Sequence, residues 1–426
     1  MATHPYGRKA PQDWWKDFLD STSSRTLESR SENKPLVVMD AFSSVGGLSV
    51  GAKVAGKLFR RPVHIALAVD QDAEAVRVHQ ANLGTDRIYT GSVRDLVDWA
   101  PGRDKQRDKK KFQFADALMP ELLDGQQVEL LLGGPPCQGH STLNNRTRSD
   151  DAKNELMTEM AALAVAYNIP NVVIENVPNA LNDARGAILE TTEYLESAGF
   201  NVFPVVVDDD RGRRPKVEIL RAIELGWPQT RKRFFLVASQ NQVPSSFSAA
   251  VEALRMTDGQ GGLPVSWAIS GMEDEPDTYP DDVWRTTPVL SDENQRRMDY
   301  LFSEGEGEGG RFDLDNHMRP VSHQDGHTYP AVYGRMRIDE PAPTITGGFL
   351  TPGRGRFIHP TRKRVLTPHE AARVQGFPDW FDFGAGLGRP PRRTELAKWI
   401  GDAVPSIMGA AAVSALMFAS PDGSQP

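Results

Sequence analysis

The chain has 426 residues, of which 39% are hydrophobic and 25% charged, and it contains a single cysteine. This length suggests two domains, or one large domain with an insertion, and can bury a full core without disulfides. One cysteine excludes an internal disulfide, and no Cys or His cluster has zinc-site spacing, so a disulfide scaffold and a structural zinc module are both excluded. No signal-peptide segment and no apolar run of roughly 20 residues is present, so we expect a soluble cytoplasmic protein without membrane contact.

The charge of the chain is unevenly distributed. The formal net charge is −8, a sign that argues against a nucleic-acid binder, whose footprint is usually basic. Residues 252–310 hold 14 acidic residues and four arginines, so this segment alone carries −10 and the rest of the chain is slightly positive, at +2. The overall sign therefore does not exclude DNA as a partner of the remaining chain.

Residues 1–34 are polar and rich in serine and charge. We expect them to form a loosely ordered arm, because few of their side chains can contribute to a core. Trp14 and Trp15 are the exception, and we interpret them as packing residues that dock the arm onto the body.

From residue 35 onward, short apolar runs alternate with helix-like stretches. This alternation indicates βαβ units and a parallel sheet covered on both faces, so we predict an α/β domain over residues 35–239. The predicted strands are residues 36–39, 64–69, 129–132, 171–174, 202–207 and 234–238, and the clearest predicted helices are residues 48–58 and 73–83.

The alternation stops over residues 240–330, which are acidic and rich in Gly and Pro. We interpret this segment as a smaller inserted lobe. Order resumes over residues 331–426, where we predict a last helix at about 400–418. The charged run 102–111 is interpreted as a solvated loop or helix face, with contact to a phosphate backbone as the alternative.

Two segments near the first strands point to a cofactor site, since open α/β sheets place their sites at the carboxyl ends of strands. Residues 40–51 (DAFSSVGGLSVG) form a turn of small residues before a helix, which allows a ligand to approach the backbone, although packing is an equally good explanation. The GxGxxG spacing of a dinucleotide site is absent. Asp70 ends the second strand, where an acid commonly binds a ribose, so the pair favours a nucleoside-containing cofactor.

Three further segments could carry the chemistry. Residues 133–141 (GGPPCQGHS) place Cys137 in a loop after a strand, where a thiolate would need a nearby positive charge or helix N-terminus. Glu175 ends another apolar strand, a costly position unless the carboxyl has partners or donates a proton. Arg231 and Arg233 lie two residues apart and share a face if extended; they are either solvated charges or ligands of a phosphate or carbonyl oxygen.

In this order, the segments resemble the motifs of the cytosine-C5 DNA methyltransferase family. The resemblance runs in family order from about residue 36 to 416. The matching segments are the cofactor motif at 40–51, the Pro-Cys-Gln loop at 133–141, Glu-Asn-Val at 175–177, Gln-x-Arg-x-Arg at 229–233, two later motifs at 340–349 and 366–381, and a final motif at 401–416 that packs back onto the cofactor domain.

The resemblance implies a prokaryotic enzyme of restriction–modification or defence, with a Rossmann-like S-adenosylmethionine-dependent domain, a mixed, mostly parallel sheet and a target-recognition lobe at 240–330. It implies methyl transfer to C5 of a cytosine flipped out of double-stranded DNA, leaving S-adenosylhomocysteine. Cys137 would attack C6, Glu175 would bind the N3/N4 edge, and Arg231 with Arg233 would brace the O2 side and the Glu175 carboxylate.

The resemblance also implies the remaining site residues. The cofactor would contact Phe42, Ser44, Gly46, Gly47, Asp70, Gln71, Ser92, Val93, Pro136, Leu156, Asp402 and Val404. The DNA would contact Gln138, Ser141, Asn176, Gln229, Thr344 and Thr346. Ser44, Ser92, His140 and Asp402 depart from the family pattern and put cofactor affinity in question. We expect no metal, and we interpret His317, His323 and His327 as surface or DNA-contacting groups.

Several alternatives stay open at this point. The chain could be a methyltransferase-like DNA-binding or regulatory protein with weak catalysis, or an RNA cytosine methyltransferase of the same fold. A Rossmann oxidoreductase is permitted by Asp70 alone, but the absent GxGxxG spacing weighs against it. A cognate restriction endonuclease or other defence components are the expected protein partners, with the enzyme acting at the nucleoid.

Overall fold

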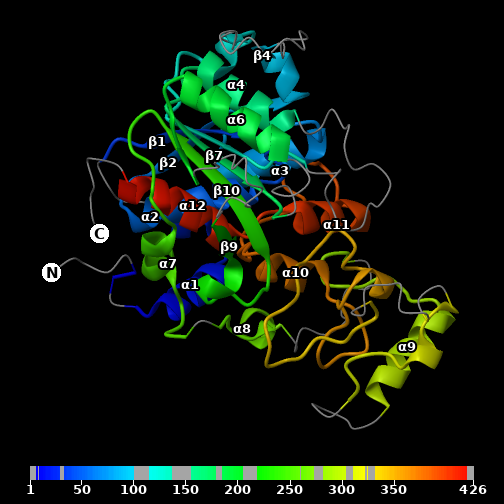
Figure 1. Ribbon diagram of the computed structural model, residues 1–426. Helices are drawn as coiled ribbons and strands as arrows, with labels where there is room; N and C mark the ends of the chain where they lie inside the picture. Colours follow the sequence, from blue (N-terminus) through cyan, green and yellow to red (C-terminus); the bar gives the residue numbers. More distant parts are fainter. Residues whose placement is uncertain are drawn as a thin grey trace.

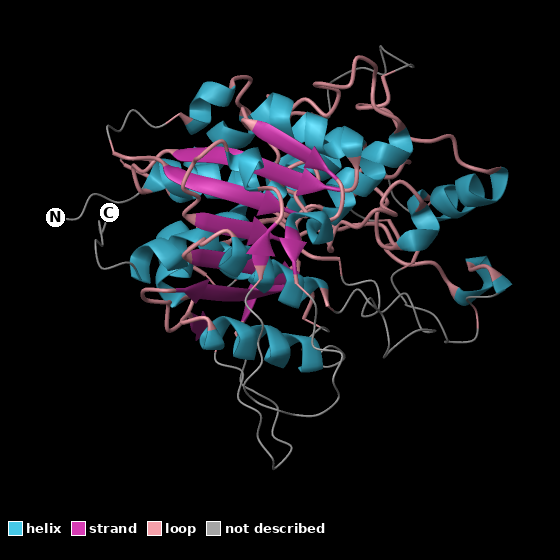
Figure 2. Cartoon of the chain, turned by 90° about the horizontal axis from the view of Figure 1, so that it is seen from above, coloured by secondary structure: helices cyan, strands magenta, loops and turns pink. Residues whose placement is uncertain are grey.

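A central sheet of eight strands organises the computed structural model (Figures 1 and 2). The structure describes residues 6–7, 9–28, 33–99, 115–136, 155–178, 185–204, 218–259, 261–272, 282–303, 310–321, 324 and 332–419. The strand order is β3-β2-β1-β6-β7-β10-β8, with β9 pairing to β10. The bounds are β1 Leu36–Ala41, β2 Val63–Asp70, β3 Arg87–Thr90, β6 Leu130–Gly133, β7 Asn171–Asn176, β8 Asn201–Phe203, β9 Ile219–Arg221 and β10 Lys232–Ser239.

The neighbouring strands β3, β2, β1, β6 and β7 run parallel to one another, whereas β10 is antiparallel to β7, β8 and β9. The predicted α/β fold with a mixed, mostly parallel sheet is therefore confirmed. The predicted strand at 202–207 is described only as far as β8, which ends at Phe203. A separate ribbon pairs β4 (Val97–Asp98) with β5 (Asp116–Ala117).

Helices cover both faces of the sheet because its central strands are apolar on both sides. Successive residues of a strand point to opposite faces, so Val38 and Met39 of β1 belong to two different apolar clusters. One cluster contains α2 (Gly47–Leu58), α3 (Ala73–Leu83), α7 (Ser248–Leu254) and α12 (Ser406–Ala419); the other contains α4 (Leu156–Ala166) and α6 (Arg185–Ser197). Figure 1 shows α4 and α6 on the opposite side of the sheet from α2 and α12.

The C-terminal part of the chain returns to the first helix. Instead of one helix at 400–418, the structure has α11 (Arg393–Asp402) and α12, separated at Pro405, which cannot continue a helix hydrogen-bond pattern. The stretch Arg393–Ala419 is apolar enough by length and composition to cross a membrane, but 78% of its most apolar window is buried inside the protein. That burial fits the core position of α12 against α2.

The N-terminal arm differs from the sequence expectation. Residues Pro11–Leu19 form a helix, α1, and the side chains of Trp15, Phe18 and Leu19 are fully buried. Trp15 packs edge-on against Trp227, with ring centroids 5.3 Å apart. The expectation of a loosely ordered arm is therefore wrong for this stretch, whereas the docking role of its tryptophans is confirmed.

The lobe also has different bounds from those expected. Residues 240–272, with α7 and the short helix α8 (Val265–Ile269), pack into the core of the body. A separate apolar cluster is built by Met298 and Leu301 of α9 (Asp292–Phe302) together with Leu314, Ile358 and Val365. We call residues 290–318 and 358–365 the lobe, and Figure 1 shows α9 standing away from the sheet.

Candidate functional site

Several of the predicted site residues that the structure describes lie along one edge of the sheet. Strands β2, β1, β6 and β7 are parallel neighbours, so their carboxyl ends lie side by side. These ends carry Asp70, the turn after Ala41, the segment after Gly133, and Glu175 with Asn176. The topology therefore brings the two halves of the predicted site, cofactor and chemistry, to the same edge.

The turn after β1 is held by Asp70. The Ser44 backbone N–H donates to Asp70 Oδ2 and the Asp72 N–H donates to Oδ1, both at 2.9 Å. Phe42 and Ser44 adopt positive φ angles of 54° and 45°, which non-glycine residues rarely do, and such strain is typical of ligand-binding turns. The Ser44 hydroxyl is buried and has no hydrogen-bond partner among the described residues, so it is available to a ligand.

Glycines let the turn pack tightly. Gly46 has a φ of 99°, and a Cβ there would lie 2.7 Å from the ring of His79. A Cβ on Gly47 would lie 2.6 Å from the carbonyl oxygen of Val404. The last motif thus touches the first cofactor turn directly, which is the arrangement that the resemblance implied for residues 401–416.

Asp402 and Ser92 flank this turn. The Asp402 side chain is 59% exposed, and the Lys398 ammonium lies 3.9 Å from it. Partial burial and the nearby Asp70 raise the pKa of Asp402, while Lys398 and Arg231 oppose that shift. Ser92 acts as an N-cap: its hydroxyl accepts from the Arg94 N–H at 3.2 Å, and the next residue, Val93, is buried. Gln71 is exposed and Leu156 half-buried.

The chemical half of the site centres on Glu175. This residue is only 8% exposed, and its carboxylate forms an ion pair with Arg233. A Cβ on Gly134 would lie 3.1 Å from Glu175 Oε2, so the segment that leads through the exposed Pro136 toward Cys137 passes close to this carboxylate. Cys137 itself, with Gln138, His140 and Ser141, lies outside the described residues.

Arg231 has a different environment from the one expected. It is 2% exposed, and its Nη1 donates to the carbonyl oxygens of Ile345 at 2.9 Å and Gly401 at 3.4 Å. Burial and the neighbouring Arg233 lower the pKa of Arg231. Its described hydrogen bonds join the Gln-x-Arg-x-Arg segment to two later motifs, and among the described residues the ion pair of the Glu175 carboxylate is with Arg233.

Gln229 is fully buried and cannot contact DNA in this structure, contrary to expectation. Its Nε2 donates to the Val374 carbonyl and to Gln375 Oε1, both at 3.0 Å. Asn176 is also buried and accepts from the Val177 N–H at 2.8 Å. Thr344 and Thr346 are half-buried, on either side of the residue whose carbonyl Arg231 binds.

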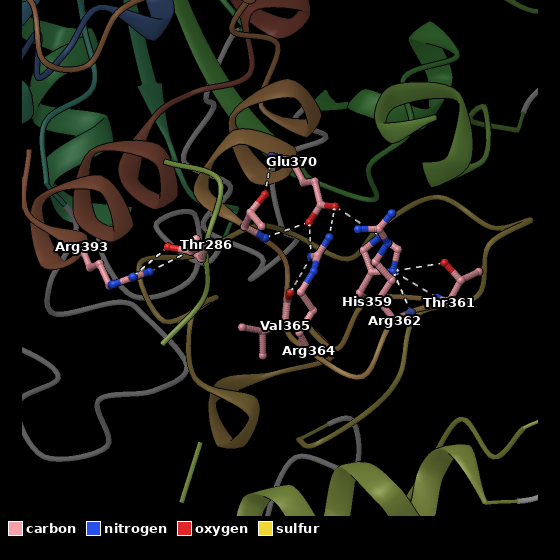
Figure 3. Close-up of polar contacts among 9 residues, drawn as sticks. Thr286, His359, Thr361, Arg362, Arg364, Val365, Glu370 and Arg393 are labelled. Carbon is pink, nitrogen blue, oxygen red and sulfur yellow. Dashed lines mark hydrogen bonds and ion pairs between the residues drawn. The ribbon is translucent and has the colours of Figure 1, made fainter. Parts of the chain in front are cut away.

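A buried ionic cluster between lobe and body was missed by the sequence reasoning (Figure 3). Glu370 of α10 (Pro368–Val374) accepts from Arg364 Nη1 and Nη2 at 2.6 and 2.7 Å, and His359 Nε2 lies 3.3 Å from its Oε1. His359 Nδ1 accepts the backbone N–H groups of Thr361 and Arg362, which assigns the ring proton to Nε2, facing Glu370. One sequence signal could have drawn attention to Glu370: the Thr-x-x-Glu pattern at 367–370, which is typical of a capping box at the start of a helix.

The cluster joins the end of the lobe to the body by polar contacts. The chain leaves the lobe at Arg364, which Glu370 holds. The chain leads toward the lobe past Thr286, whose carbonyl and hydroxyl oxygens each accept from Arg393 of α11 at 2.8 Å, as Figure 3 also shows. Both helices belong to the body, so the body holds the chain shortly before residue 290 and at the end of residues 358–365.

Comparison with known proteins decides the family. The model of the C-5 cytosine-specific DNA methylase family matches residues 36–416. The chain belongs to this family. It is 35% identical over 374 residues to the type II methyltransferase M1.BsuMI of Bacillus subtilis (strain 168), covering 87% of this chain and 77% of that protein. It is 28% identical over 381 residues to the type II methylase M.HgiDII of Herpetosiphon aurantiacus, covering 87% and 92%.

A solved structure agrees on the fold. The Entamoeba histolytica methyltransferase EhMeth superposes with a TM-score of 0.56 at 12% identity, covering 90% of this chain and 98% of that one. The predicted family and fold are thus confirmed. This C5 methylase uses S-adenosyl-L-methionine to methylate C5 of cytosine in DNA. The unpaired Ser44 hydroxyl and the Gly46–Gly47 turn beside Asp70 fit such a cofactor.

Proposed function

We propose that this C5 methylase is the modification enzyme of a restriction–modification or defence system and acts on a flipped-out cytosine through a covalent bond from Cys137 to C6. The observation that supports the residue roles best is the buried ion pair of Glu175 with Arg233, which lies beside Gly134 on the segment leading to Cys137. We expect the enzyme to work in the cytoplasm at the nucleoid, alongside a cognate endonuclease.

The chain's own residues would act in sequence. The Cys137 thiolate adds to C6 of the flipped base, which makes C5 nucleophilic. Glu175 donates a hydrogen bond or proton at N3 as negative charge develops there, and Arg233 keeps the carboxyl of Glu175 oriented. After methyl transfer, loss of the C5 proton allows the thiolate to leave. The sulfonium of S-adenosylmethionine supplies the electrophilic methyl group.

Cofactor and DNA would occupy neighbouring positions. Phe42, Ser44, Gly46, Gly47 and Asp70 would hold the methionine and ribose, with the turn at Ser92 and Val93 on the adenine side. Pro136, Leu156, Asp402 and Val404 would complete the pocket. Thr344 and Thr346, on the half-buried segment beside the active site, would face the DNA, together with Gln138 and Ser141, and the lobe would read the target sequence.

The direct test measures transfer of tritium from S-adenosylmethionine to duplex DNA by the purified chain and by Cys137→Ser. We expect labelling by the native enzyme and none by the variant, because serine is too weak a nucleophile at C6. Duplex DNA with 5-fluorocytosine should trap a denaturation-resistant adduct with the native enzyme only. Labelling that survives in Cys137→Ser would contradict the covalent mechanism.

Two further measurements separate the alternatives. Bisulfite sequencing of DNA from expressing cells reports which cytosines carry the methyl group and in which sequence. A parallel assay on transfer RNA tests the RNA alternative, and preferential labelling of RNA would contradict double-stranded DNA as the substrate. Binding of S-adenosylmethionine without labelling of either nucleic acid would favour a regulatory DNA-binding protein.

A further inference from the structure

Arg94 forms an ionic clasp that the site described above does not use. It lies in a short 3₁₀ turn, Val93–Leu96, directly after the proposed adenine contacts Ser92 and Val93. Its Nε donates to Glu159 Oε1 at 2.6 Å, and its Nη2 donates to Glu155 Oε2 at 3.3 Å. Glu155 is the N-cap residue of α4 and Glu159 lies in its first turn, so one arginine joins the adenine-side turn to the start of this helix.

The two acids differ in burial, which makes the clasp asymmetric. The Glu155 side chain is 48% exposed, whereas that of Glu159 is 4% exposed. A buried carboxylate is costly without a cation, and Arg94 is the cation that contacts it. Burial raises the pKa of Glu159, and Arg94 opposes that shift. The Oε2 atom of Glu159 has no hydrogen-bond partner among the described residues. The described hydrogen bond to the Glu159 carboxylate is therefore the one that Arg94 donates to Oε1.

Helix α4 is also in contact with the chemical half of the site. A Cβ on Gly133, at the end of β6, would lie 2.5 Å from the sulfur of Met160. Gly133 immediately precedes Gly134, which lies against Glu175. The first half of α4 therefore touches the adenine-side turn through Arg94 and the end of β6 through Met160, and its first residue is Leu156.

We propose that Arg94 is a positioning residue that sets the distance between the adenine-side turn and α4, and so determines cofactor affinity through Val93 and Leu156. This inference rests on the proposed cofactor contacts of those two residues. Val93 is buried in the same apolar cluster as Met157 and Met160, so a shift of the turn relative to α4 would displace a packed side chain.

The test is a double-mutant cycle of Arg94→Gln and Glu159→Gln, with affinity for S-adenosylhomocysteine measured by calorimetry. We expect each single variant to weaken binding about tenfold, a typical size for coupling through a packed network. The double variant should be no weaker than Arg94→Gln, because both changes break the same clasp. The KM for S-adenosylmethionine should rise in parallel, while the KM for DNA stays within about twofold.

Two further variants keep the result decisive. Arg94→Lys should bind S-adenosylhomocysteine with intermediate affinity, since one ammonium can contact only one of the two carboxylates. This variant replaces Arg94→Gln in the test if Arg94→Gln does not fold. Arg87→Gln is the matched control: Arg87 is 47% exposed against 46% for Arg94, and its ion-pair partner among the described residues is the exposed Asp124, so affinity should not change.

The outcomes distinguish this inference from the proposed function. Unchanged affinity in Arg94→Gln, or single effects that multiply in the double variant, would overturn the clasp while leaving methylation by the native enzyme intact. Failure of the native enzyme to bind S-adenosylhomocysteine would instead count against the cofactor contacts themselves.

Discussion

Arg231 and Arg233 are two residues apart, yet their environments give them separate tasks. Arg233, on β10, faces the carboxyl end of β7 and pairs with Glu175. Arg231 precedes the strand and is enclosed by later segments of the chain, where it binds the carbonyls of Ile345 and Gly401. One arginine therefore pairs with the carboxylate that we propose as a reacting group, and the other holds motifs together.

This division predicts different phenotypes for the two arginines. Arg233→Gln should lower kcat about 10²- to 10³-fold, the usual cost of removing one group that stabilises developing charge, and it should also lower the free energy of unfolding, because the buried Glu175 carboxylate loses its cation. Arg231→Met should lower the free energy of unfolding by about 2–4 kcal/mol, because two buried carbonyls lose their donor. Initial rates and urea unfolding of both variants check this; a loss of kcat in Arg231→Met as large as that in Arg233→Gln would contradict the assignment.

At the scale of elements, the contact of α2 with α12 depends on small residues. A Cβ on Gly51 would lie 2.5 Å from the Ser406 carbonyl oxygen, and Gly409 lies against Leu48 of α2. Neither helix can recede, because α12 is buried along most of its length. The close approach brings the final motif to the cofactor turn.

Gly51→Ala tests this contact. Alanine is favoured over glycine in a helix by about 1 kcal/mol, but overpacking against a fixed carbonyl costs about 1–3 kcal/mol, so we expect a net loss of stability. Thermal unfolding measures it, and the KM for S-adenosylmethionine should rise as the turn moves. Gly261→Ala is the control, because a Cβ there meets nothing within 4 Å. Equal stability of the two variants would show that the helices can separate.

Elements also show where local sequence signals were insufficient. Strands β1, β2, β6, β7 and β10 were recognisable because each contains a buried apolar run over consecutive residues, whereas the short strands β3 and β9 were not predicted. Helix α1 was not recognised, because its nine residues include exposed polar groups. Its apolar face is buried by packing against Trp227, more than 200 positions away in the sequence. Proline at the first helical position and the spacing of Trp15 and Phe18 were the available signals.

For the whole molecule, the position of the lobe depends on Glu370. Its carboxylate is almost fully buried, and His359 and Arg364 both face it from the segment that leaves the lobe. Despite burial, these two partners lower the pKa of Glu370 well below its usual range. The ionised form is therefore bound more tightly in the folded protein than in the unfolded chain.

Glu370→Gln should destabilise the protein by about 3–5 kcal/mol near pH 7, because Arg364 and His359 lose a buried partner. The lowered pKa gives stability that is present above the ordinary glutamate pKa of about 4.3 and declines as the pH falls below it. The difference in the free energy of unfolding between the native enzyme and Glu370→Gln should therefore decrease below about pH 4. Urea unfolding across pH checks this, with Glu340→Gln, at an exposed pair with Arg337, as a control that changes stability by less than about 1 kcal/mol.

The sequence by itself determined the alternation of strands and helices, the family and the residue types that follow the strands, because each of these is encoded in short contiguous segments. Tertiary structure alone decided that Gln229 is buried, that Arg233 rather than Arg231 meets Glu175, and that the lobe core draws on residues 290–318 and 358–365. These outcomes depend on which distant segments enclose a side chain. A periodicity or a motif cannot specify that, because burial and partner choice follow from packing of the whole chain.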